Sequence, residues 1–248
     1  MKILFQILST GSMRSELQYI SMLCAKRGAA TGIVYGHRGY MAKSRNAALN
    51  TFLKGDCDVL IQCDEDVIPP LNILDITRWR KPIVGTIALY ANERGPTPNF
   101  KPISPLTQAD LMPIPAGDVP LVEVAWIGTG CYSITRAAAE HMVKTYVKAF
   151  AHDDQPDGSE GMGVDVFMCY RAREAGLSVW LDRSLLCGHS KEMTWAPTKD
   201  GQLAILPYGS MWVGDNVPKD GNARKSYSEL LAEMGMNPDA LSSEVYDA

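Results

Sequence analysis

Two aspartates separated by one residue are the side chains in this sequence best suited to chemistry. Asp64 and Asp66 belong to the segment CDEDVIPP, residues 63–70, and follow the apolar run 59–61. In extended chain, side chains two residues apart leave the same side of the backbone, so the two carboxylates would lie side by side. A hard divalent cation relieves their repulsion at the lowest cost and also neutralises phosphate oxygens. An acidic turn is the alternative, but the buried-strand pattern before the aspartates favours a metal site.

Several common catalytic motifs are missing from the sequence. It contains no GxxxxGKS/T, no HExxH, no GxSxG and no GxGxxG linked to a strand. The P-loop, zincin, hydrolase and dinucleotide-binding classes therefore lose their signatures. His152, Asp153 and Asp154 form another cluster of acids and imidazole. A solvated turn is the better interpretation of that cluster, because the surrounding segment is rich in Gly, Asp and Pro.

The composition is that of an ordinary globular protein. The chain of 248 residues is 46% apolar and 21% charged, which excludes a disordered or fibrous protein. Its net charge of −4 argues against non-specific binding of nucleic acid. The six cysteines form no CxxC pair and indicate buried thiols in a reducing compartment. No apolar stretch reaches the roughly 18 residues that a membrane span needs, so we expect a cytoplasmic protein without such a span.

The elements that would hold these side chains alternate between strands and helices. Strands are expected at 3–8, 31–35, 59–61, 83–89, 122–134 and 177–181, and helices at 15–27, 48–54, 135–150 and 166–175. This order predicts an α/β fold with a mixed, mostly parallel sheet that has helices on both faces. Seven prolines between Pro96 and Pro120 predict a long surface loop without regular structure. A mobile loop is expected at 152–163.

One domain is expected over residues 1–206. A C-terminal extension would follow at 207–248, with a short helix at 226–234 and a possible function as a lid. In sheets of the predicted kind, ligands bind at the carboxyl ends of the strands. The polar segments that follow the strands are 9–14, 64–66, 128–130 and 188–191.

Five segments in one order resemble glycosyltransferases of the GT-A fold, which use nucleotide sugars. The segments are Arg45-Asn46 at a helix start, VLIQCDEDVIPP, WIGTGCYSITR, GVDVFMCYRAREAG and LCGHS. The resemblance covers about residues 2–190, which is most of the chain. Small enzymes of this kind occur in bacteria and in bacteriophages, and some phage members are similar to enzymes that glycosylate modified DNA bases. A phage protein would act in the host cytoplasm.

The resemblance implies a metal site with three protein ligands. Asp64 and Asp66 match the D-x-D motif, which holds Mn²⁺ or Mg²⁺ against the diphosphate of the donor. His189 matches the histidine that often completes the metal shell. An imidazole ligand favours Mn²⁺, because Mg²⁺ prefers an all-oxygen octahedron. The alternative for His189 is a structural histidine near a strand end.

The resemblance also implies a set of donor-binding residues. Arg45 and Asn46 would lie at a helix start beside the diphosphate or the donor sugar, although a surface helix cap is the alternative. Ser9, Thr10 and Gly11 would contact the nucleobase and ribose, or form a plain turn. Glu65, between the two aspartates, belongs to the same donor-binding set.

The remaining implied residues lie toward the acceptor. Asp165 would take the proton from the acceptor hydroxyl, or would only cap the helix that follows. The first acid of the usual pair is Val164 here, and Glu160 is a second candidate base. Trp126 and Gly128, with Thr129 and Gly130, would line the sugar and acceptor pocket, although Trp126 is equally typical of a core position. Lys191 and Trp195 are expected to fold over the diphosphate as a lid.

The sequence therefore predicts a metal-dependent glycosyltransferase that moves a hexosyl or pentosyl group from a UDP-sugar to an acceptor hydroxyl. The acceptor is a glycan, a protein or a modified base such as a 5-hydroxymethylpyrimidine in phage DNA. Direct attack would invert the sugar C1 centre, and similar folds also support retention. Two alternatives remain, a metal-dependent phosphohydrolase or nucleotidyltransferase and a non-catalytic nucleotide-binding module.

Overall fold

The computed structural model divides the chain into two compact units, Met1–Ser190 and Lys191–Ala248. It describes residues 1–11, 15–36, 41–92, 95–103, 105–107, 111, 120–153, 161–189, 193–197 and 203–207. Among these residues, no helix is both long enough and apolar enough to cross a membrane. The candidate site lies in the first unit.

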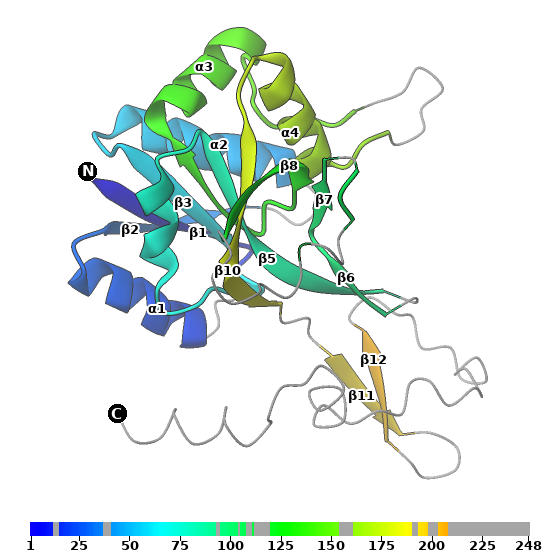
Figure 1. The fold of residues 1–248 in the computed structure, drawn as a ribbon. Helices are drawn as coiled ribbons and strands as arrows, with labels where there is room; N and C mark the ends of the chain where they lie inside the picture. The colour runs from blue at the N-terminus through cyan, green and yellow to red at the C-terminus, as the bar shows by residue number, and fades with distance from the viewer. Residues whose placement is uncertain are drawn as a thin grey trace. The chain divides into compact units, whose positions relative to one another are not determined.

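A mixed sheet forms the centre of the first unit (Figure 1). Its strands are β1 (Ile3–Ser9), β2 (Ala30–Tyr35), β3 (Val59–Asp64), β5 (Ile83–Asn92), β7 (Phe100–Pro102), β8 (Leu121–Ile127), β9 (Cys131–Thr135) and β10 (Val179–His189). They follow the order β2-β1-β3-β9-β5-β10-β8-β7, in which β8 and β9 run against the other six. The short strands β4 (Val67–Ile68) and β6 (Gly95–Pro98) pair with β10 and β5.

Helices cover both faces of this sheet, and each face has its own apolar core. The α-helices are α1 (Ser15–Lys26), α2 (Met41–Lys54), α3 (Arg136–Tyr146) and α4 (Val164–Glu174), and η1 (Ile73–Trp79) is a 3-10 helix. Leu17 of α1 and Ile73 of η1 pack with Phe5 on one face, whereas α2, α3 and α4 cover the other. The prediction of an α/β fold with a mixed sheet between helices is confirmed.

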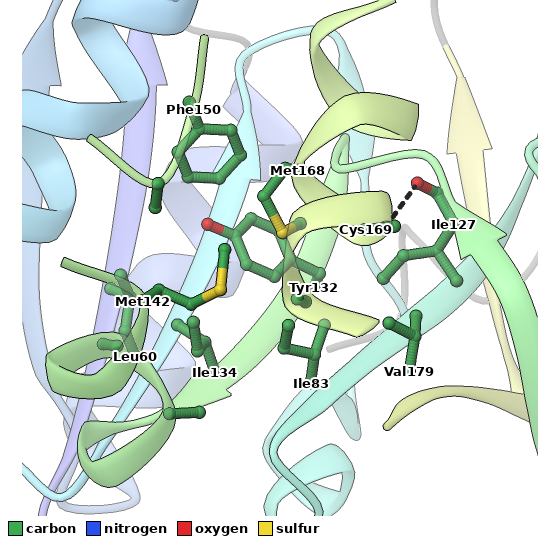
Figure 2. Packing of buried hydrophobic residues seen from close by; sticks show 14 of the residues in the cluster. Leu60, Ile83, Ile127, Tyr132, Ile134, Met142, Phe150, Met168, Cys169 and Val179 are labelled. Atoms are coloured by element: carbon green, nitrogen blue, oxygen red, sulfur yellow. Dashed lines mark hydrogen bonds between the residues drawn. The ribbon is translucent and has the colours of Figure 1, made fainter. Parts of the chain in front are cut away.

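The larger core lies under α2, α3 and α4. Figure 2 shows Tyr132 at its centre, between Phe150, Met142 and Met168. The Tyr132 and Phe150 rings meet edge to face with centroids 6.3 Å apart, a favoured arrangement for aromatic pairs. These contacts fix β9 against the three helices, and β9 begins where the candidate site lies.

Helix α3 begins at the residue that the sequence predicts as its cap. The Thr135 side chain accepts a hydrogen bond of 3.3 Å from the Ala138 amide, so one of the free amides of the first turn is satisfied. The helix ends at Tyr146 rather than at 150, because Val147 has a φ of 62°. Arg136 donates to the carbonyls of Phe52, Leu53, Gly55 and Cys57 and so ties α3 to the C-terminus of α2.

Strand β10 contains a bulge that reverses the faces of its side chains. Asp182 pairs with Thr86, but Leu186 pairs with the next residue of β5, Ile87. Three residues are therefore added, and an odd number exchanges the two faces of a strand. Leu181 before the bulge belongs to the core under α2, α3 and α4, whereas Leu185 after it belongs to the core under α1.

A buried carboxylate holds this bulge. Asp182 accepts hydrogen bonds from the Trp79 indole at 2.6 Å and from the Ser184 amide at 3.0 Å. The Ser184 hydroxyl donates to the same carboxylate. Because the carboxylate is fully buried, these donors supply the hydrogen bonds that water would otherwise make.

The prediction of a loop without regular structure at 96–120 is partly wrong. Strand β6 crosses the start of this segment, and β7 lies within it. Pro96 and Pro98 stand in β6, which pairs with β5. Pro102 stands in β7, the last strand in the order of the sheet. Proline cannot donate to a ladder but is tolerated at a sheet edge. Phe100 lies between these prolines and is fully buried. Burial of its apolar ring explains why the segment packs onto β8.

The second unit contains an antiparallel pair, β11 (Met193–Pro197) and β12 (Leu203–Pro207), in which Trp195 pairs with Ile205. The predicted boundary between residues 206 and 207 falls within β12. The predicted helix at 226–234 lies outside the described residues, as does Lys191. The domain division and the lid therefore stay predictions.

Candidate active site

Four predicted polar segments gather at one edge of the sheet. Leu8, near the end of β1, pairs with Asp64 at the end of β3, and the Asp64 amide donates to the Gly130 carbonyl at 2.8 Å. His189, at the end of β10, pairs with Val67 just after the aspartates. The carboxyl ends of β1, β3 and β10 thus meet the turn between β8 and β9, as the topology of such sheets requires.

Arg45 binds the Asp64 carboxylate from the buried side of the site. Its two terminal nitrogens donate to the two Asp64 oxygens at 3.0 and 2.8 Å, which is the fork geometry of a strong arginine–carboxylate pair. The Arg45 side chain is 1% exposed and that of Asp64 is 24% exposed. The guanidinium is therefore turned into the protein. Because α2 begins at Met41, the predicted position of Arg45 at a helix start and the alternative of a surface cap are wrong. Its predicted contact with a diphosphate stays a prediction.

Asp165 is the second carboxylate beside Arg45. Thr129 donates to it through its amide at 3.1 Å and through its hydroxyl, and the Arg45 Nε lies 3.7 Å from its Oδ1. The N-cap of α4 is Gly163, without a side-chain cap bond. The alternative that Asp165 only caps α4 is therefore wrong, since its carboxylate is directed to the β8–β9 turn. Its function as a base stays a prediction.

Asp66 and His189 form a separate pair on the more open side. The His189 Nε2 lies 3.2 Å from an Asp66 oxygen. Asp66 is 47% exposed, whereas the imidazole is 7% exposed. The prediction that the chain stays extended through 66 is wrong, because β3 ends at Asp64 and a turn follows. Asp64 and Asp66 consequently contact different partners, Arg45 and His189.

Glu65 joins the ends of β1 and β3. It accepts hydrogen bonds from the Ser9 hydroxyl at 2.7 Å, from the Thr10 amide at 2.8 Å and from the Thr10 hydroxyl. The Gly11 amide donates to the Ser9 hydroxyl at 3.1 Å, and Gly11 has a φ of 122° that favours glycine. The structure thus brings together residues 9–11, which were predicted to contact the nucleobase and ribose, and Glu65, which was predicted only as a donor-binding residue.

The charges of the site alter the pKa values of its members. Burial raises the pKa of Asp64 to about 6, although the charge of Arg45 and its hydrogen bond act in the opposite direction. Burial by itself would lower the pKa of Arg45, but the charges of Asp64 and Asp165 raise it above its usual value. Arg45 therefore remains charged at any pH at which the protein is folded.

The other predicted residues lie in more ordinary surroundings. Asn46 exchanges hydrogen bonds with the main chain of Phe150, at 2.6 and 3.1 Å. Trp126 is partly buried against the larger core. Gly128 is buried and donates to the Asn99 carbonyl. Asp153 accepts from the Met162 amide at 2.9 Å, which fits the predicted turn. Glu160 lies outside the described residues.

Sequence reasoning missed Gln62 and Tyr132. The Gln62 side-chain oxygen accepts from Arg45 and from the Tyr132 hydroxyl, each at 3.2 Å. Both side chains are fully buried. A glutamine inside the apolar run of β3 is the signal that could have identified this layer, because a buried amide needs polar partners.

Comparisons with known proteins identify relatives of the fold. No family model matches the chain, and no curated protein matches it. The structure of A197 from STIV has a TM-score of 0.52 and 22% sequence identity, over 87% of this chain and 100% of that one. The structure of GalNAc-T7 with UDP, GalNAc and Mn²⁺ has a TM-score of 0.47 and 12% sequence identity, over 76% of this chain and 44% of that one. The structure of S. aureus TarS has a TM-score of 0.41 and 10% sequence identity, over 77% of this chain and 60% of that one. The A197 match shows a shared fold.

Proposed function

We propose that this chain is a metal-dependent glycosyltransferase that transfers a sugar from a nucleotide diphosphate donor, a UDP-sugar, to an acceptor hydroxyl. The observation that carries the proposal is the convergence of two carboxylate centres at one sheet edge. The Asp66–His189 pair is one centre, and the Asp64–Arg45–Asp165 group is the other. The first suits a cation and a diphosphate, and the second suits a proton acceptor. The sequence resemblance to nucleotide-sugar enzymes supports the same assignment.

The donor set of the first centre fits Mn²⁺. Asp66 and His189 supply an oxygen and a nitrogen 3.2 Å apart, and a mixed set of this kind suits Mn²⁺ better than Mg²⁺. Among the described residues, no group of three His, Cys, Asp or Glu side chains could hold an ion. Donor phosphates and water would therefore complete the shell of Asp66 and His189, because both oxygens of Asp64, the third ligand that the sequence predicts, accept hydrogen bonds from Arg45. When bound, the ion would neutralise charge on the departing nucleotide.

We infer that Asp165 accepts the proton of the acceptor hydroxyl. Thr129 fixes both of its oxygens, and a quarter of the side chain remains exposed. A carboxylate oriented in this way can remove the hydroxyl proton as the acceptor oxygen attacks the sugar C1, for a rate gain of about 10² to 10⁴. Direct attack gives inversion at C1.

The nucleoside would bind where Glu65 meets residues 9–11. The Glu65 carboxylate and the hydroxyls of Ser9 and Thr10 lie together in the structure and present the acceptor and donor groups that a ribose requires. Glu65 is already hydrogen-bonded to the turn, so the site is organised before the donor arrives. Preorganisation of this kind lowers the entropy cost of binding.

The experiment is a transfer assay with UDP-sugars, Mn²⁺ and a panel of acceptors. The panel contains DNA with 5-hydroxymethylpyrimidines, which the phage-like sequence resemblance suggests first, together with glycan and protein acceptors. Release of UDP only when an acceptor is present would support the proposal. Release of the sugar as its 1-phosphate, with UMP either free or joined to the acceptor, would support the alternative phosphohydrolase or nucleotidyltransferase and refute sugar transfer.

Variants identify the metal centre in a separate measurement of Mn²⁺ binding. Asp66→Ala and His189→Ala should weaken Mn²⁺ binding, measured by calorimetry, by about 10-fold or more, as loss of metal-site residues commonly does. Matched controls are Asp75→Ala and His141→Ala. Their hydrogen bonds are to the Asn72 side chain and to the Ala175 carbonyl rather than to a residue of the candidate site. Wild-type Mn²⁺ affinity in either site variant would contradict the assignment.

A further inference from the structure

A single buried guanidinium joins the two carboxylates that the proposed reaction uses. Arg45 lies on α2, Asp64 ends β3, and Asp165 stands in the first turn of α4. These three residues come from elements far apart in the sequence. Only the guanidinium lies within ion-pair distance of both carboxylates among the described residues, at 2.8 Å from Asp64 and 3.7 Å from Asp165.

The Nε of Arg45 makes no hydrogen bond to a described residue and lies within ion-pair distance of Asp165. One terminal nitrogen serves Asp64, Gln62 and the Thr129 carbonyl, and the other serves Asp64. The Nε is buried and has no hydrogen-bond partner. The Asp165 carboxylate lies 3.7 Å from this nitrogen. A buried donor without a partner costs free energy. Arg45 therefore favours any position of Asp165 that shortens this contact.

The surroundings of Arg45 hold it in place from both sides. The Phe150 ring lies over the guanidinium, with its centroid 5.9 Å away, and Asn46 fixes the main chain of Phe150 through its amide side chain. From the sheet side, the Gln62 side-chain oxygen accepts from the same guanidinium and is itself held by the Tyr132 hydroxyl. The Arg45-Asn46 pair thus acts as one unit, in which Asn46 positions the ring that covers Arg45.

We propose that Arg45 is a positioning residue that sets the distance and orientation between Asp64 and Asp165. The inference rests on the proposed function, because in that function Asp165 is the base and the donor binds at the same sheet edge, beside the end of β3 where Asp64 lies. It differs from the sequence-based prediction for Arg45, which places the guanidinium on the donor diphosphate. The two assignments make opposite predictions for kinetics.

A positioning residue changes turnover and leaves donor affinity alone. Lysine carries the same charge but only one nitrogen, so Arg45→Lys cannot hold Asp64 with a fork and face Asp165 as well. Misplacement of a reacting group by about 1 Å can cost about 10²-fold in rate. We expect Arg45→Lys to lower kcat by about 10²-fold, with the donor KM and the UDP affinity by calorimetry within about threefold of wild type.

Guanidinium ion provides a test that does not depend on turnover. Arg45→Ala removes the side chain, and free guanidinium can occupy the space between the carboxylates. In about 20 mM guanidinium chloride, the melting temperature of Arg45→Ala should rise by about 2–4 °C relative to the same concentration of NaCl. The wild type should show no rise. The same ion should restore part of the lost turnover.

Arg136 is the matched control, because it is a second arginine that bridges separate elements. Its guanidinium donates to main-chain carbonyls at the end of α2. Arg136→Lys should lower the melting temperature and leave kcat at the wild-type value. This result would show that a loss of stability alone does not produce the effect at Arg45.

The outcomes separate the inference from the proposed function. If Arg45→Lys keeps wild-type kcat, or if its loss appears as a raised donor KM with weaker UDP binding, the positioning role is refuted. Failure of guanidinium to raise the melting temperature of Arg45→Ala also refutes it. If the wild-type chain transfers no sugar, the proposed function fails, and the guanidinium shift still decides whether Arg45 holds the two carboxylates.

Discussion

Gly85 lies at the centre of the sheet, where the structure leaves no space for a side chain. It is buried in β5 and pairs with Tyr132 on β9 and with Leu181 on β10. A Cβ added at this position would lie 2.7 Å from the Ile127 Cδ1 and 2.9 Å from both its Cβ and its Cγ2. A rotation of the Ile127 side chain cannot relieve all three contacts, because the Cβ is attached to the backbone of β8.

Gly85→Ala should therefore destabilise the protein by overpacking. Insertion of a methyl group into a packed core typically costs about 1–3 kcal/mol. For a domain of this size, such a loss corresponds to a fall of about 2–12 °C in melting temperature. The main chain of Ile127 has to move with its side chain, and Thr129, which positions Asp165, follows two residues later. We therefore also expect lower transfer activity in this variant.

Gly32→Ala is the control for this prediction. Gly32 also stands in a strand, but a Cβ there would have no neighbour within 4 Å, so the free energy of unfolding should change little. Urea denaturation of the wild type and both variants measures the difference. Ile127→Val in the Gly85→Ala background removes one of the three close atoms and should recover part of the loss. Equal stability of the two alanine variants would refute the overpacking argument.

Three further predictions concern titration, helix capping and thiols. Because burial raises the pKa of Asp64 to about 6, the folded protein keeps a proton between pH 4 and 6 that the unfolded chain has released. As the pH rises from 4 to 6, the free energy of unfolding of the metal-free protein should therefore fall by about 2 kcal/mol more than that of Asp64→Asn. Urea titrations at each pH measure both values. Thr135→Ala removes the acceptor for the Ala138 amide and should cost about 1 kcal/mol, whereas Thr135→Ser should restore most of it. N-ethylmaleimide should label the partly exposed Cys57 in the native protein but not Cys169, since burial raises the pKa of Cys169 to about 12, and mass spectrometry after labelling with and without urea checks this.

The sequence was sufficient to predict the elements of the fold because their signals are local. The apolar run of β3 and the spacing of α3 depend on near neighbours along the chain, and both elements begin where they were expected, although their ends differ. The segment after Pro96 was mispredicted for a reason that is not local. A proline is excluded from the middle of a sheet but not from its edge, and the sequence does not state which strand becomes the edge.

The candidate site could be predicted as a set of residues but not as a set of contacts. Asp64 and Asp66 look equivalent in sequence, yet a turn directs one toward Arg45 and the other toward His189. The link from Arg45 to Asp165 spans 120 positions and depends on how α2 and α4 pack on the sheet. Side-chain partners over such separations follow from tertiary packing rather than from local propensity.

The bulge in β10 restricts how this strand can change in evolution. Its three added residues determine which side of the sheet His189 faces, because successive side chains of a strand alternate. An insertion or deletion of one residue between Asp182 and Leu186 would turn the imidazole to the opposite side and separate it from Asp66. A change of two residues would keep its direction. Homologous chains that retain the histidine should therefore differ in length here by even numbers.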